Sequence, residues 1–162
     1  MSGVFNLNHP QDLLAKMARE LNRLRVSPDD VDHAFNFFVT AEHMLDWIHP
    51  EPERRAQRKA LRRDDPLLAT VSHLASGAKH FDHLQGLHMS VTKSERRVGA
   101  WADGAWAPSM WAPGAWRPTK LWVTLDGEAA EAFGARIDAL AMAEKVFRYW
   151  SEPGRVPPRD LP

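Results

Sequence analysis

Apolar residues recur at steps of three and four through the first half of the chain, and proline-containing signals divide this helical pattern into segments. The pattern predicts a helix from Pro10 to about Arg25, since proline suits the first helical position. A serine, a proline and two aspartates at 27–30 begin a second helix, which continues to about Ile48. This helix is apolar nearly all round, so we expect it at the centre of the fold.

Two shorter helical segments follow. The first is expected over residues 52–63. The second begins after an Asp-Asp-Pro cap at 64–66 and runs to about Phe81, with an apolar face at helical spacing. From Gly86 onward the helical period is lost, so we expect a different structure there.

A period of two replaces the helical period in the next part of the chain. Apolar residues alternate with polar ones over 87–92 and again over 121–125, which predicts two antiparallel strands. A last helix is expected from Asp126 to about Trp150. These strands are therefore expected to form a hairpin that precedes the last helix.

The elements together predict a mainly α fold. We expect a single helical domain over residues 1–150, built as a four- to five-helix bundle. A β-hairpin and a Trp-rich turn loop, together residues 84–125, are inserted before the last helix. Residues 151–162 contain four prolines and are expected to form an extended tail.

Composition excludes several classes of function. Lys+Arg and Asp+Glu both number 21, so no overall field draws the chain to nucleic acid or membrane. The absence of cysteine excludes disulfides, thiolate metal ligands and a cysteine nucleophile. No segment approaches the roughly 20 apolar residues of a membrane span, and residues 1–10 lack the pattern of a signal peptide. We expect a cytoplasmic protein with no cofactor and no membrane partner.

The only internal repeat lies between the two predicted strands, where tryptophan recurs at every fifth residue. Pro-Gly and Asp-Gly pairs within the repeats favour β-turns, so we expect a row of turns with indole rings on one side. The rings either cover the bundle as an extension of its core or form an exposed platform. A platform would bind a protein partner or stack on single-stranded bases. The four residues are Trp101, Trp106, Trp111 and Trp116.

Two of the predicted helices carry a polar stripe rich in histidine. The first stripe consists of Asp32, Asn36, His43 and Asp46, and the second of His73, Ser76, His80 and His83. Residues three, four and seven apart share one face of a helix, so each stripe points in one direction. If the two helices pack together, titratable groups meet inside an apolar bundle, where burial is costly without a purpose.

Several uses fit these stripes. In the pair His43 and Asp46 the carboxylate can orient the imidazole. His80 could act as acid or base in phosphodiester cleavage without a metal, with Lys79 offsetting the phosphate charge. A polar network that fixes helix register is the structural alternative. Zinc, manganese or iron binding is the competing chemistry, although the Glu-x-x-His pattern of di-metal bundles is absent. The residues of that metal site would be His43, Asp46, His73 and His80.

The predicted helix over 52–63 carries a dense run of basic residues and little apolar surface. We therefore expect it in solvent, either as an ordinary exposed helix or as a surface that holds phosphates. Acidic residues flank the run on both sides and lower its local charge. The candidate nucleic-acid-binding residues are Arg54, Arg55, Arg58, Lys59, Arg62 and Arg63.

The chain reads Thr-Ala-Glu-His-Met-Leu-Asp-Trp over 40–47 and Leu-Ala-Ser-Gly-Ala-Lys-His-Phe over 74–81. These motifs resemble those of small bacterial and phage-associated proteins of no settled function, whose second motif usually reads Ala-Asn-x-x-Lys-His-Phe. A run of Gly-Ala-Phe-Ser units in that group is similar to the tryptophan repeat here. The resemblance covers roughly residues 30–150. It implies that one site contains His43, Asp46, Lys79 and His80.

The helical layout is also similar to HEPN-type bundles, many of which are metal-independent ribonucleases of toxin or defence systems. In those enzymes four to six residues separate an arginine from the active histidine on one helix. No arginine stands at that distance before His73 or His80. The similarity implies RNA binding, with cleavage as an added activity.

Three functional hypotheses follow from these residues. The first is a HEPN-like protein of a mobile-element or defence setting that binds RNA and cleaves it without a metal. The second is a non-enzymatic, phage-related interaction module, expected as a homodimer, that holds a protein partner through the tryptophan loop. The third is a metal-dependent enzyme with a His/Asp site between helices.

Overall fold

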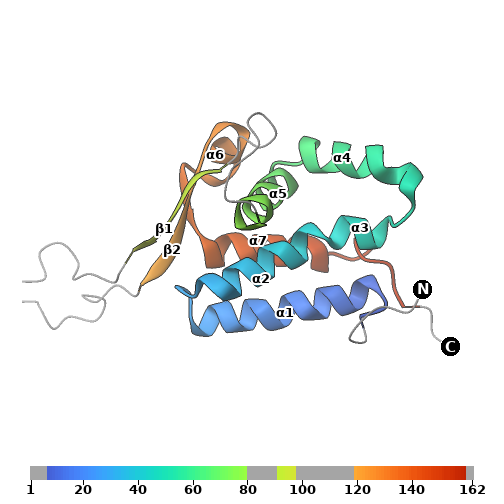
Figure 1. Ribbon diagram of the computed structural model, residues 1–162, viewed down its shortest axis with the longest axis horizontal. Helices are drawn as coiled ribbons and strands as arrows, with labels where there is room; N and C mark the ends of the chain where they lie inside the picture. The colour runs from blue at the N-terminus through green and yellow to red at the C-terminus, as the bar shows by residue number, and fades with distance from the viewer. Residues whose placement is uncertain (1–6, 80–90, 98–118, 160–162) are drawn as a thin grey trace, which may run out of the picture.

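Several helices of the chain begin at capping residues, and the helices pack into a mainly helical fold (Figure 1). The computed structural model describes residues 7–79, 91–97 and 119–159. A three-stranded antiparallel sheet precedes the last helix. The elements in chain order are α1 (Pro10–Val26), α2 (Val31–Glu42), α3 (Met44–Ile48), the 3-10 turn η1 (Pro52–Arg54), α4 (Arg55–Asp64), α5 (Pro66–Lys79), β1 (Val91–Arg97), β2 (Lys120–Leu125), α6 (Gly127–Phe133), β3 (Arg136–Asp138) and α7 (Ala139–Ser151).

Capping side chains fix the starts of α1, α2 and α5, although α2 begins at Val31 with Asp30 as its cap, later than the predicted start at Ser27 and Pro28. His9 and Asp12 cap the first turn of α1 reciprocally. The carboxylate of Asp30 accepts from the amide of His33 at the start of α2, and Asp65 accepts from the first amides of α5. Each cap satisfies backbone donors that have no partner within the helix.

The predicted second helix is divided, because the chain leaves the α-helical geometry at His43. Its backbone has ψ −9°, whereas an α-helix has about −42°. Helix α2 therefore ends at Glu42, and the short α3 continues in nearly the same direction (Figure 1). The prediction of one unbroken helix to Ile48 was wrong at this point.

The prediction of one last helix from Asp126 to about Trp150 was also wrong, because a strand interrupts it. Gly134 ends α6 with a φ of +86°, a conformation that side chains disfavour. The chain then forms β3, which pairs with β2, and Asp138 caps the start of α7. The expected two-stranded hairpin is accordingly the β1–β2 part of a three-stranded sheet in the order β1-β2-β3. The described first strand lies over 91–97, later than the predicted 87–92.

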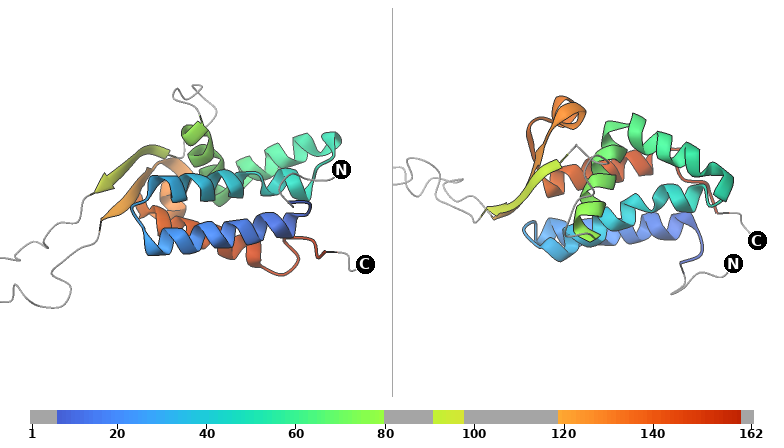
Figure 2. Two further views of the ribbon diagram at one scale, coloured as in Figure 1. Left: turned by 60° about the horizontal axis from the view of Figure 1, so that its bottom comes forward. Right: turned by 45° about the horizontal axis from the view of Figure 1, so that its top comes forward.

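Helices α1, α2, α5 and α7 enclose the core. Helix α1 runs side by side with α2 in the opposite direction, and α7 packs against both (Figures 1 and 2). The core is apolar and tightly closed around Phe37 of α2, which is fully buried. Other fully buried side chains of the core include Met17, Leu21, Leu24, Met44, Met142 and Val146.

The sheet occupies the end of the bundle where α2 and α7 begin, opposite the start of α1 and the end of α7 (Figure 1). After α7 the chain turns back onto α1. Gln11 donates to the carbonyl of Pro157, Arg159 pairs with Asp12, and Val156 is buried. No described helix is long and apolar enough to cross a membrane.

We predict that replacing the central ring will strongly destabilise the fold. Phe37→Ala should lower the free energy of unfolding by about 3–5 kcal/mol, because it leaves a cavity in a closed core. Phe35→Ala is the matched control on the same helix, since the Phe35 side chain is 39% exposed. Chemical denaturation measures both losses, and equal losses would contradict the central position of Phe37.

We also predict a pH-dependent contribution from Glu95 in β1. Hydrogen bonds from Lys93 and Arg97 lower the pKa of Glu95 from its ordinary 4.5 to about 2. Because the folded pKa lies below the unfolded one, the ionised group stabilises the fold above pH 4.5, and this contribution is lost as the pH falls toward 2. Glu95→Gln should therefore lower the melting temperature at neutral pH, and the difference from the unchanged protein should vanish near pH 2. Glu131→Gln, an exposed carboxylate of α6, is the control and should show no such convergence.

Candidate functional site

The junction between α2 and α3 gathers three titratable side chains. The Nδ1 atom of His43 lies 3.6 Å from a carboxylate oxygen of Glu42 and 3.7 Å from one of Asp46. The imidazole is 45% exposed, so a molecule from solvent can reach it. The spacing of three residues, one helical turn, brings Asp46 back to the side of His43. The structure thus brings together the predicted pair.

Two arginines of α4 bind the same carboxylates. The Nε atom of Arg62 lies 3.0 Å from Glu42, and its Nη2 atom lies 2.9 Å from Asp46. The Nε atom of Arg58 lies 2.9 Å from the second oxygen of Asp46. These guanidinium groups also donate to the backbone carbonyls of Glu42, His49 and Glu51. The junction is therefore a compact network of alternating charges, which we call the junction cluster: Glu42, His43, Asp46, Arg58 and Arg62.

The junction cluster suits proton transfer better than cation binding. Ligand atoms of Glu42, His43 and Asp46 all lie within 4.8 Å of one another, a spacing compatible with a metal ion. Both carboxylates, however, are already neutralised by Arg58 and Arg62, and a cation would have to displace these guanidinium groups. An accessible imidazole next to carboxylates can exchange a proton with a bound group, and the arginines add positive charge nearby.

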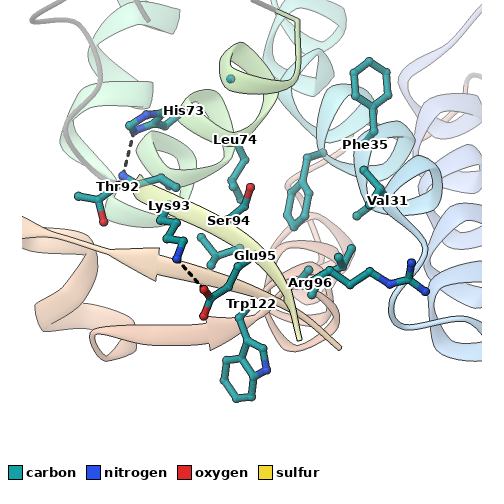
Figure 3. Close-up of a pocket in the computed structure, with 17 residues that line it drawn as sticks. Val31, Phe35, His73, Leu74, Thr92, Lys93, Ser94, Glu95, Arg96 and Trp122 are labelled. Atoms are coloured by element: carbon teal, nitrogen blue, oxygen red, sulfur yellow. Dashed lines mark hydrogen bonds and ion pairs between the residues drawn. The ribbon is translucent and has the colours of Figure 1, made fainter. Parts of the chain in front are cut away.

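His73 lies elsewhere, so it does not join His43. It is buried in α5, and its Nδ1 atom accepts from the amide of Val91 at 2.9 Å (Figure 3). It lines a cavity with Val31 and Phe35, from the half of α2 that is remote from His43. Since Nδ1 accepts, the neutral ring carries its proton on Nε2. This bond connects α5 to β1, which is a structural role.

The other residues of the two polar stripes do not converge with the junction cluster. Asp32 and Asn36 are exposed on α2, and Ser76 is half-buried on α5. Helix α5 ends at Lys79, whose side chain lies outside the described part of the structure, as does His80. Of the four predicted metal ligands, the structure therefore describes His43, Asp46 and His73. His73 lies apart from the other two, so the three do not form one site. Also outside the described residues are His83, Trp101, Trp106, Trp111 and Trp116.

Helix α4 divides the predicted basic run into two groups. Arg58 and Arg62 point inward to the junction cluster, and Arg54 pairs with Glu51 and contacts His49. The remaining three are exposed at four-residue spacing, which places them on one side of α4. Of these, Arg63 pairs with the adjacent Asp64, while no described residue pairs with Arg55 or Lys59. We call Arg55, Lys59 and Arg63 the outer stripe.

A second candidate site, which the sequence did not reveal, is a cavity of about 520 Å³ between α2, α5 and β1 (Figure 3). Phe35, Phe38 and Leu74 give it apolar walls, and Val91–Arg96 of β1 form its other side. No sequence signal pointed to it, since the exposure of Val31 and Phe35 is known only from the structure. On the opposite face of the sheet, Arg136 lies 5.0 Å from the ring of Trp122.

Comparison with known proteins gives no relative from which a function could be carried over. No protein-family model matches the chain, and neither a curated protein nor a solved structure was found to be similar.

We predict that Arg62 holds α4 in place. Arg62→Met should lower the free energy of unfolding by on the order of 1–2 kcal/mol, because it leaves Glu42 without its arginine and Asp46 with Arg58 alone, a loss that solvent partly compensates. Amide hydrogen exchange in α4 should accelerate. Arg55→Met, which removes a cation of the outer stripe, should change stability by less than about 0.5 kcal/mol. Similar effects of the two variants would contradict the inward role of Arg62.

Proposed function

We propose that the chain binds RNA through the outer stripe of α4 and that His43 provides acid/base chemistry at the neighbouring junction cluster. The proposal follows the HEPN-like interpretation of the sequence, including a mobile-element or defence setting, and both remain predictions. The observation that supports RNA binding best is the division of the basic run, since Arg55 and Lys59 are exposed and have no pairing partner among the described residues.

The outer stripe has the form of a phosphate-binding surface. Residues four apart on a helix are separated by about 6 Å along its axis, so Arg55, Lys59 and Arg63 make a row of cations. A row of this kind attracts successive phosphates without reading the base sequence. The chain has no net charge, so binding depends on this local row and is expected to be weak and sensitive to salt.

The junction cluster supports the catalytic half of the proposal. In metal-independent cleavage, a base removes the proton of the attacking hydroxyl and an acid protonates the leaving oxygen. His43 is accessible for either step, and Asp46 can orient its ring. Arg58 and Arg62 would offset negative charge that develops on the phosphate, at the cost of loosening their own ion pairs. Lys79 and His80 keep their predicted roles as phosphate-stabilising and acid/base residues in this proposal.

The non-enzymatic module that uses the tryptophan loop remains the alternative proposal, since that loop lies outside the described residues. The metal-dependent enzyme is less favoured because arginines bind both carboxylates of the junction cluster.

We predict that RNA binding depends on the outer stripe. The double variant Arg55→Gln, Lys59→Gln should weaken binding of a short oligouridylate and lower the slope of log affinity against log salt by about 1.4, since each contact to a single strand contributes about 0.7. The matched control is Lys145→Gln, Arg148→Gln, which removes two exposed cations from α7. Fluorescence anisotropy over a salt series measures both, and equal slopes in the two variants would refute the assignment of the outer stripe.

We predict that cleavage, measured in the presence of a chelator, depends on His43. His43→Ala should retain oligouridylate binding but lose cleavage by roughly 100-fold or more. His80→Ala tests the second predicted acid/base residue in the same assay. If neither variant changes cleavage, the catalytic claim is wrong, while the binding claim stands or falls with the outer stripe.

A further inference from the structure

We propose that the cavity beside β1 is a peptide-binding groove. An extended segment of a partner protein would add to the sheet as a fourth strand at β1. The segment would alternate apolar residues with polar ones and carry a lysine or arginine near one end. This inference concerns a different surface from the RNA-binding proposal and does not depend on it.

The first support is the position of β1 at the edge of the sheet. The order β1-β2-β3 leaves one long side of β1 without a strand partner in the described part of the chain. Antiparallel strands direct the backbone groups of alternate residues toward or away from a neighbour. An edge of this kind is a template for another strand.

The register identifies which groups of β1 face outward. The amide of Leu121 donates to the carbonyl of Pro28, and that of Leu125 to the carbonyl of Ala135. Both amides thus point away from β1. Arg96 is paired opposite Leu121, so its own N–H and C=O point away from β2, as do those of Ser94 two residues earlier. The backbone N–H and C=O groups of Ser94 and Arg96 have no hydrogen-bond partner among the described residues.

His73 shows how one such group is satisfied. Val91 is paired opposite Leu125, so its N–H also points outward, and it donates to Nδ1 of His73 (Figure 3). The His73 side chain, which comes from α5, therefore occupies the edge of the sheet at the start of β1. The edge is open from Ser94 onward, where no side chain takes the corresponding place in the described structure.

The groove runs along the whole of β1 and also reaches the adjoining part of the sheet. Every residue of Val91–Arg96 borders it, and so do Leu121, Trp122 and Val123 of β2. Its other wall is formed by α2 and α5, with Leu74 turned toward the strand (Figure 3). Val31 is 59% and Phe35 39% exposed, so apolar surface is available to alternate side chains of an added strand. A volume of about 520 Å³ lies within the range of ligand sites.

Charge complementarity indicates the basic end of the partner segment. The start of α2 borders a second hollow, which continues from the groove past Arg96 and is lined by Asp29, Asp30 and Asp32. Arg96 neutralises Asp29, and Asp30 caps α2 beside His33. Asp32 is exposed and has no pairing partner among the described side chains. This end of the groove is therefore acidic and suits a lysine or arginine.

Cations of β1 do not block the groove, because they are engaged within the protein. Lys93 lies 2.7 Å from Glu95, and Arg96 is held by Asp29. Exposed lysines on an edge strand often prevent unwanted pairing. Here the ammonium group of Lys93 is bound to its neighbour on the strand, which leaves the backbone edge accessible.

The experiment uses the full chain and three fluorescent hexapeptides in which valine, leucine or phenylalanine alternates with threonine and a lysine stands at one end. At least one peptide should bind the unchanged protein and protect the amides of Ser94 and Arg96 from hydrogen exchange. Val31→Asn, which removes apolar surface without adding charge beside the acidic hollow, should weaken that binding roughly tenfold. Val26→Asn is the matched control, because Val26 is an 84% exposed valine outside the groove, and it should bind normally.

Two altered peptides test the mode of binding. Replacing lysine by glutamate should weaken binding, and replacing alternate threonines by proline should abolish it, because proline cannot donate to a strand. Equal binding of the proline peptide would overturn strand addition. Failure of all three parent peptides at millimolar concentration, or equal loss in Val31→Asn and Val26→Asn, would overturn the groove itself.

Other occupants give distinct results. If oligouridylate protects the Ser94 and Arg96 amides and the peptides do not, the groove is a nucleic-acid surface and the proposal is wrong. Protection that rises with protein concentration in the absence of peptide would identify a second copy of the chain as the occupant, and it would also overturn the proposal.

Discussion

The ion pairs of Arg58 and Arg62 with Glu42 and Asp46 are the interactions on which the functional surface depends. Helix α4 has no buried residue, so the hydrophobic effect contributes little to holding it against the bundle. Its position is set instead by two partly buried guanidinium groups that bind carboxylates and backbone carbonyls of the α2–α3 region. This orientation determines which cations face solvent and leaves His43 at the border of the network.

Local signals in the sequence were enough to predict those helices whose formation depends on residues within the helix and next to it. The starts of α1 and α5 follow from the proline and aspartate signals before them, whereas α2 starts three residues after the predicted Pro28, with Asp30 as its cap. The break at His43 and the division of the last helix were missed. Strand β3 has only three residues and exists because β2 offers it a partner, which is information that spacing along the chain does not contain.

The candidate sites show the same limit. The contact between His43 and Asp46 could be predicted, because residues three apart meet on a helix. Which arginines of α4 point inward could not be predicted, since this depends on where the helix docks. The groove beside β1 was hidden because Val-Thr-Lys-Ser-Glu-Arg-Arg has no apolar alternation, and its edge exists only through the strand order.

The return of the chain onto α1 after α7 has a practical consequence for the architecture. Contacts of Gln11 with Pro157 and of Asp12 with Arg159 hold the two ends of the described fold together. They do so at the end of the bundle opposite the sheet (Figure 1). An anchor or a fused domain attached at either end would therefore lie at one end of the bundle, and the edge of β1 would lie at the opposite end, away from it.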